Sequence, residues 1–158
     1  MSQQTDGVQL ARGEGRSVWL FTDPHTIKAG RSETQGAYTL SEVWATPNVG
    51  PPAHIHHRED ESFFILEGTF EFSLASRTFT AGQGSFAYLP RGVVHSHKAI
   101  GGPGRAVIVH SPAGLEDFLE EAGKPVSDRT VRPNPPDALE AGRVIAIAAK
   151  YGIEVPQS

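Results

Sequence analysis

The chain has 158 residues, which suits one domain with a sizeable hydrophobic core. Its 17 glycines and 12 prolines favour a turn-rich β fold over a helical protein. A formal net charge of −4 with scattered Lys and Arg argues against a nucleic-acid partner, and the lack of cysteine excludes disulfides and thiolate metal ligands.

Residues 1–16 are polar and contain several glycines, so we expect a flexible lead-in to the domain. This stretch lacks the apolar core of a secretion signal. No apolar run in the chain approaches the length of a membrane span. We therefore expect a cytoplasmic protein that has no membrane partner.

Residues 17–111 predict a series of short strands separated by Gly and Pro turns, as in a β-sandwich or barrel. The clearest signal lies in residues 69–74, where Phe70, Phe72 and Leu74 alternate with more polar residues. The candidate strands cover residues 17–21, 25–29, 38–44, 61–66, 69–74, 78–80, 85–89, 95–100 and 105–110.

After Ser111 the apolar pattern changes to a helical period. Pro112 suits a first helical turn, and the helix that follows is predicted to end near Gly123. Asp137 is suited to cap a second helix over residues 138–151. We expect residues 17–111 to form a β-barrel, and residues 112–158 to form a helical segment packed on it.

His54 and His56 are the centre of the candidate site. In a strand, residues two apart point to the same face, so these imidazoles should project together. Two imidazoles in a core are costly unless something uses their lone pairs, and a divalent metal does so. The charged residues 58–60 predict a bend, which turns Glu61 toward the two histidines, and His95 is a fourth candidate ligand.

The segments that carry these residues resemble the two sequence motifs of the cupin family. Ala99 stands where many members carry Asn, at a position that is not a metal ligand. The resemblance implies an all-β fold, a single antiparallel jelly-roll barrel with short C-terminal helices, that holds one divalent metal through His54, His56, Glu61 and His95. The first motif corresponds to Gly50, His54, His56, Glu61 and Gly68, and the second to Gly84, Pro90, Gly92 and His95.

Within the cupins, residues 51–68 and 149–154 most resemble single-domain quercetin 2,3-dioxygenase-like proteins. The resemblance implies a metal-dependent dioxygenase that acts on a small aromatic, flavonol-type substrate with O₂, with Glu61 as both ligand and base. Fe, Mn, Ni, Co, Cu and Zn all remain open as the metal. Two alternatives also remain open: a non-enzymatic cupin that binds or senses a small molecule, and a metal-dependent isomerase, cyclase or lyase.

Alternation along the strands predicts an apolar substrate pocket around the metal. His97 has two interpretations: it lines this pocket, or it is a partly exposed strand histidine. His25, His57 and His110 are predicted to lie at the surface or at the rim of the core. The predicted pocket residues are Phe63, Ile65, Phe72, Phe86, Tyr88 and His97.

Aromatic residues near the N-terminus predict an interaction surface. Trp19, Phe21 and Trp44 carry more aromatic area than a lone small barrel needs at its surface. We therefore expect a homodimer that pairs through this region.

Overall fold

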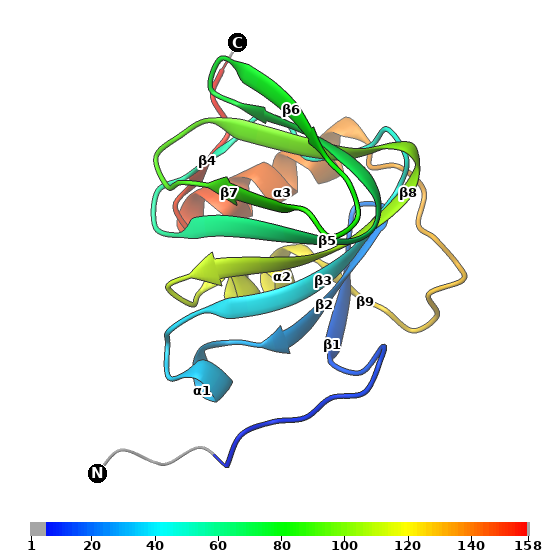
Figure 1. The fold of residues 1–158 in the computed structure, drawn as a ribbon, viewed down its shortest axis with the longest axis vertical. Coiled ribbons are helices and arrows are strands. Elements are labelled where there is room, and N and C mark those ends of the chain that lie inside the picture. The colour runs from blue at the N-terminus through cyan, green and yellow to red at the C-terminus, as the bar shows by residue number, and fades with distance from the viewer. Residues whose placement is uncertain (1–5, 158) are drawn as a thin grey trace.

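Two long strands, β5 (Asp60–Leu74) and β8 (His95–Ser111), pair antiparallel along their length and form the centre of the fold. They are seen in a computed structural model that describes residues 6–157 (Figure 1). The other strands are β1 (Arg16–Leu20), β2 (Asp23–Ala29), β3 (Thr39–Ala45), β4 (Ile55–His56), β6 (Arg77–Ala81), β7 (Phe86–Leu89), β9 (Lys124–Pro125) and β10 (Ile153–Glu154). The helices are α1 (Arg31–Thr34), α2 (Leu115–Ala122) and α3 (Ala138–Lys150).

The main sheet has the strand order β6-β5-β8-β3-β2-β1-β9, with β7 paired to the free side of β5, while β10 and β4 form a separate two-stranded sheet. The described strands curl into an open jelly roll, which confirms the predicted fold class, although the main sheet is not closed by hydrogen bonds among residues 6–157. No helix in this part of the chain is both long and apolar enough to cross a membrane.

β5 and β8 each stay continuous where the sequence predicts two separate strands. Their pairing register shifts on both sides of Glu67. The next residue, Gly68, has a φ of 76°, and a Cβ there would lie 2.6 Å from the Pro103 carbonyl oxygen. Gly101 in β8 also has a positive φ. The glycines therefore bend the strand pair without ending it, because only glycine adopts this backbone at no steric cost.

Two apolar clusters fill the fold. The first lies inside the curved sheet, and the second lies between the β1–β2 hairpin and the helices, which Figure 1 shows behind the sheet. Asp137 caps α3 as predicted, since its carboxylate accepts a hydrogen bond from the Glu140 amide at 2.8 Å. Members of the first cluster include Phe63, Ile65, Phe70, Phe72 and Leu89; the second includes Val18, Ile27, Phe118, Leu119 and Ile147, with Phe21 packed against it.

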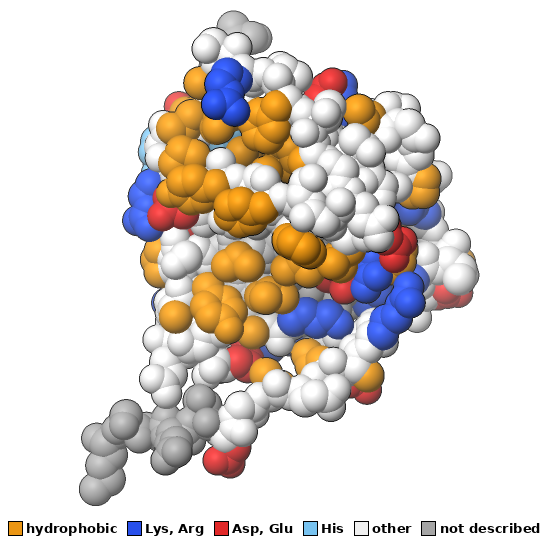
Figure 2. Space-filling view, viewed as in Figure 1, with side chains coloured by type: hydrophobic (Ala, Val, Ile, Leu, Met, Phe, Trp, Pro, Cys, Tyr) orange, Lys and Arg blue, Asp and Glu red, His pale blue; other side chains and the backbone are white. Residues whose placement is uncertain are grey.

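The exposed aromatic surface lies elsewhere than the sequence predicts. Trp19 is buried, and the Arg105 guanidinium carbon covers the Trp44 ring at 4.8 Å from its centroid. Three exposed aromatic side chains, Phe64 (47%), Phe86 (65%) and Tyr88 (49%), lie instead on the outer face of β5 and β7. Figure 2 shows apolar side chains gathered over this face.

Two glycine substitutions test the packing of this fold. In Gly104→Ala, the new Cβ would lie 2.5 Å from the buried Phe70 ring, so we expect the free energy of unfolding to fall by about 1–3 kcal/mol. In the control Gly142→Ala, nothing lies within 4 Å and the site is inside α3, so stability should rise by up to about 1 kcal/mol. Urea denaturation measures both, and a Gly104→Ala protein as stable as the parent would contradict the packing.

Candidate metal centre

Backbone pairing brings the two motif segments together. His54 and His95 form an isolated antiparallel bridge, in which each amide donates to the other residue's carbonyl at 2.9 Å. His56 lies in β4, and the chain bends at residues 57–58 before β5 begins, which confirms the predicted bend. Glu61, the second residue of β5, therefore turns toward the three histidines.

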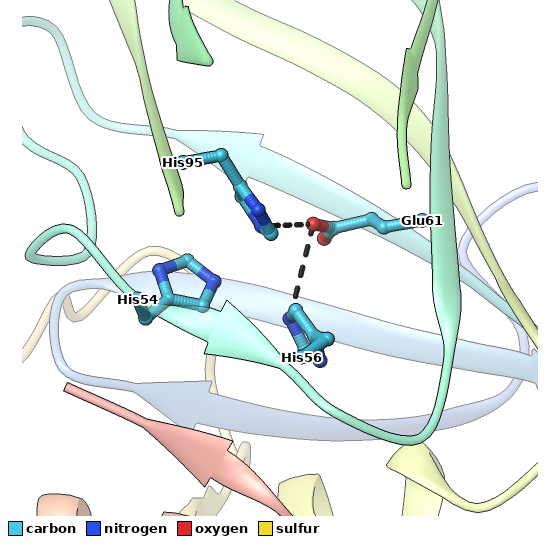
Figure 3. Close-up of side chains that lie close together, drawn as sticks. All are labelled: His54, His56, Glu61 and His95. Atoms are coloured by element: carbon cyan, nitrogen blue, oxygen red, sulfur yellow. Dashed lines mark ion pairs between the residues drawn. The ribbon is translucent and has the colours of Figure 1, made fainter. Parts of the chain in front are cut away.

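The four predicted ligands form one buried cluster. One potential ligand atom from each of His54, His56, Glu61 and His95 lies within 4.8 Å of all the others. Glu61 Oε2 is 2.8 Å from His95 Nε2 and 3.8 Å from His56 Nε2. Figure 3 shows the imidazoles and the carboxylate directed toward a common point, and none of the four residues is more than 7% exposed.

Backbone carbonyls fix the tautomers of two ligands. His54 Nδ1 lies 2.8 Å from the Pro52 carbonyl oxygen, and His95 Nδ1 lies 2.9 Å from that of Val93. A carbonyl oxygen only accepts, so Nδ1 carries the hydrogen in each neutral ring and Nε2 keeps its lone pair. This orientation of imidazoles by a partner on the other nitrogen is typical of metal-ligating histidines.

The charge states of the cluster suit a cation. Burial lowers the pKa of His54 to about 3, so its imidazole is neutral near pH 7. Burial alone would raise the pKa of Glu61, but the charge and hydrogen bond of His110 hold it well below its usual range. Burial likewise disfavours charge on His95, yet the Glu61 carboxylate beside it raises the pKa of His95 overall. The result is an ionised carboxylate among imidazoles.

Unpartnered buried atoms test whether a metal fits here. Glu61 Oε2 and His95 Nε2 are both buried and, despite their short separation, lack the alignment of a hydrogen bond. Leaving such atoms without a partner costs free energy, and a divalent cation would satisfy both. The nitrogen and oxygen donors are ones that transition metals accept. The residues therefore fit a metal ion.

Two residues that the sequence analysis missed support the cluster. His110 lies opposite Glu61 in the β5–β8 register, and its Nε2 donates to Glu61 Oε1 at 3.0 Å. It is buried, so its predicted place at the surface or rim is wrong, although alternation with Ala106 and Ile108 could have revealed it. Glu59, also buried, has Oε2 at 3.5 Å from Nδ1 of His56.

No comparable signal existed for Glu59, because it lies in a run of charged residues that resembles an exposed loop. Of the other histidines, His57 is exposed as predicted, and its Nε2 contacts Glu154 at 2.7 Å. His25 is only partly exposed, and burial lowers its pKa to about 3.

The predicted pocket residues divide between the two faces of the sheet. Phe63, Ile65 and Phe72 are fully buried on the inner face, and the His97 ring packs 4.7 Å from that of Phe63. Burial lowers the pKa of His97 to about 4, and its Nδ1 has no hydrogen-bond partner among the described residues. His97 is partly exposed in β8, which agrees with its interpretation as a partly exposed strand histidine, and its ring faces the inner side of the sheet.

Phe86 and Tyr88 correct the prediction, because they do not lie on the inner face. In the β5–β7 register Phe86 pairs with Phe64 and Tyr88 with Ser62, which face outward, whereas Ala87 and Leu89 point inward. Alternation correctly divides this strand into two faces, but it does not identify which face is buried.

Comparison with known proteins agrees with this architecture. Residues 45–110 match the sequence model of the cupin domain. An uncharacterized protein of Streptomyces coelicolor is 32% identical over 82 residues, which span 52% of this chain and 72% of that protein. The chain therefore belongs to the cupin family, and it contains a single cupin domain.

More distant relatives share the fold or part of the sequence. Quercetin 2,3-dioxygenase of Bacillus subtilis is 25% identical over 136 residues, which are 86% of this chain but only 40% of that enzyme. An RmlC-like cupin from Shewanella frigidimarina has a TM-score of 0.60 at 16% identity, covering 75% of this chain and 99% of its own. The polyketide cyclase RemF from Streptomyces resistomycificus has a TM-score of 0.57 at 21% identity, and the similarity covers 66% of this chain and 78% of the RemF chain. The two structural similarities show the common fold.

Ligand substitutions test whether the cluster acts as one site. His56→Ala and His95→Ala should each remove most of the bound metal, and the double variant should lose little more, because either change disrupts the same ion. At metal concentrations near 100 times the dissociation constant, each should also lose about 2.7 kcal/mol of metal-linked stabilisation. Elemental analysis and melting temperatures measure these effects.

Two further histidines serve as controls in that experiment. His57→Ala should keep its metal because the side chain is exposed and pairs with Glu154. His97→Ala should also keep it, since His97 lies outside the four-residue cluster. Full metal retention in His95→Ala, or a large loss in His97→Ala, would show that the fourth ligand is wrongly assigned.

Proposed function

We propose that His54, His56, Glu61 and His95 hold one divalent transition metal, and that the loaded protein is a dioxygenase-like enzyme. Its substrate would be a small aromatic molecule of the flavonol type, which reacts with O₂. The observation that carries the proposal is the buried cluster itself, in which a carboxylate oxygen and an imidazole nitrogen lack hydrogen-bond partners. Fe, Mn, Ni, Co, Cu and Zn all accept such donors.

A metal with these four ligands supplies Lewis acidity and open coordination positions for a small molecule. Glu61 supplies a proton acceptor. Its Oε1 is held by His110, whereas its Oε2 faces the cluster without a hydrogen bond. An ionised carboxylate in this position can take a proton from a substrate hydroxyl.

The sequence similarity supports the choice of reaction. The match to quercetin 2,3-dioxygenase extends over 86% of this chain, well beyond the motif segments. Because this chain spans less than half of that enzyme's length, the activity is a proposal here. The fold neighbour RemF is named as a polyketide cyclase, so a metal-dependent reaction without O₂ is a distinct outcome of the experiment below.

A second candidate function is a non-enzymatic cupin that binds or senses a small aromatic molecule. The burial of the cluster supports it, because no ligand residue is more than 7% exposed and a reaction needs direct contact between the substrate and the metal, which binding alone does not. The two candidates predict the same metal content and the same ligand binding. They differ only in turnover.

Oxygen uptake distinguishes these functions. Protein loaded separately with Fe, Mn, Ni, Co or Cu is mixed with a panel of flavonols and catechols, and we expect uptake with at least one pair. Glu61→Gln should retain part of the metal, because an amide oxygen still coordinates weakly. It should lower turnover by about 10²–10⁴-fold, because an amide cannot accept the proton. Tight binding without uptake would favour the sensing cupin, and turnover without O₂ would favour an isomerase, cyclase or lyase.

We also propose that two copies of the chain pair through the outer face of β5 and β7. Phe64, Phe86 and Tyr88 are uncharged. When two copies of this face meet, no like charges are therefore brought together at the centre of the interface. Together they expose about 300 Å² of aromatic surface, given about 200 Å² for a whole side chain. A standard interface buries about 800 Å² on each partner, so these side chains would form its centre.

Light scattering at micromolar concentration tests the pairing. The parent protein should have the mass of a dimer, and Phe86→Glu should have that of a monomer, because a buried charge without a partner is strongly unfavourable. Leu139→Glu is the matched control, since Leu139 is 84% exposed in the first turn of α3, outside this face. A monomeric parent protein would exclude the dimer.

A further inference from the structure

A cavity of about 520 Å³ lies beside the metal centre, and the proposed function does not use it. Its lining comes from α1, the bend before β5, the β8–α2 connection and the ends of α2 and α3. Small-molecule sites usually have volumes of about 300–1,000 Å³, so the cavity is large enough for an organic ligand.

The lining of the cavity includes three cationic side chains. Arg31 pairs with Asp117 at 3.2 Å, and Lys150 pairs with Glu121 at 2.5 Å. Arg58 makes no hydrogen bond or ion pair with any residue between 6 and 157. One guanidinium group in the lining is therefore available to a ligand.

The backbone holds Arg58 in place. A Cβ at Gly152 would lie 2.8 Å from Arg58 Nε and 3.0 Å from its Cγ, so the arginine stem packs directly on the bare Gly152 backbone. Gly152 has a φ of 74°, which glycine adopts without strain. The His57 amide donates to the Gly152 carbonyl at 2.9 Å and fixes the two segments together. A guanidinium positioned in this way loses little freedom when it binds an anion.

The wall of the cavity near Gly114 combines a donor and an acceptor. A Cβ at Gly114 would lie 3.4 Å from Arg31 Nη2 and 3.7 Å from Glu59 Oε1, so both atoms border the space that this glycine leaves open. The other oxygen of Glu59 lies 3.5 Å from His56 Nδ1. Glu59 is therefore a wall of the cavity and a neighbour of a metal-ligand candidate at the same time.

We propose that this cavity binds a small organic anion, a hydroxycarboxylate or a phosphate, and that its occupancy is coupled to the metal centre through Glu59 and His56. The anionic group pairs with Arg58, whose planar fork matches carboxylate and phosphate oxygens. The hydroxyl group of the ligand donates to Glu59, which accounts for a carboxylate in a site for an anion. The binding part stands independently of the proposed function, whereas the coupling rests on it.

Isothermal titration calorimetry of the metal-free full chain at low salt tests the binding, with lactate and inorganic phosphate as the probes. We expect saturable binding of at least one probe, and Arg58→Gln should weaken it about tenfold or more, the usual effect of losing a charged hydrogen bond. Arg77→Gln is the matched control, because Arg77 is an exposed arginine that lies over Phe79 on β6, outside the cavity. The Arg77→Gln protein should bind the probe with the same affinity as the parent protein.

Two results would overturn the binding site: no saturable binding of either probe at millimolar concentration, or equal affinities in Arg58→Gln and Arg77→Gln. The coupling is measured by titrating a divalent metal into the protein with and without the saturating probe. We expect the probe to change the affinity for the metal, and the metal to change the affinity for the probe by the same factor. Both changes should vanish in Glu59→Gln. An unchanged metal affinity would overturn the coupling alone. A protein that binds the probe but no metal would overturn the proposed function, and the coupling with it, but not the anion site.

Discussion

The backbone hydrogen bonds between His54 and His95 are the constraint on which the candidate site depends. They join a segment that precedes β5 to one that begins β8, and they set the distance between two imidazoles before any metal is present. The carbonyls of Pro52 and Val93, each two residues upstream, then orient the same rings. Main-chain geometry thus positions both nitrogen donors, which leaves little side-chain entropy to lose when an ion binds.

The carboxylate of the cluster depends on a different support. Glu61 lies in an almost fully buried position where an unpaired charge would be very unfavourable. His110 compensates by donating to Oε1 from the neighbouring strand, and their direct pairing in the β5–β8 register makes this contact a property of the sheet. The two central strands therefore stabilise the fold and keep the site's acidic group ionised.

Much of this arrangement could be predicted from the sequence. The spacing of His54 and His56, the charged bend and the resemblance to the cupin motifs together identified the four residues that the structure gathers into one cluster. Alternation with Ala106 and Ile108 indicates that His110 faces inward, but nothing in the local sequence indicates that Glu61 is its partner. Alternation likewise divided Phe86 from Ala87 without showing which side faces the core. Such errors arise because strand pairing, which sequence periodicity does not encode, decides what each face meets.

The short pairing of β10 with β4 has a consequence for the order of events during synthesis. His56 and Ile55 pair with Ile153 and Glu154, so the strand that carries one of the metal-ligand candidates is completed by residues made much later. All four candidates leave the ribosome before that partner strand exists. The edge of β4 therefore stays unpaired until nearly the whole domain has been synthesised.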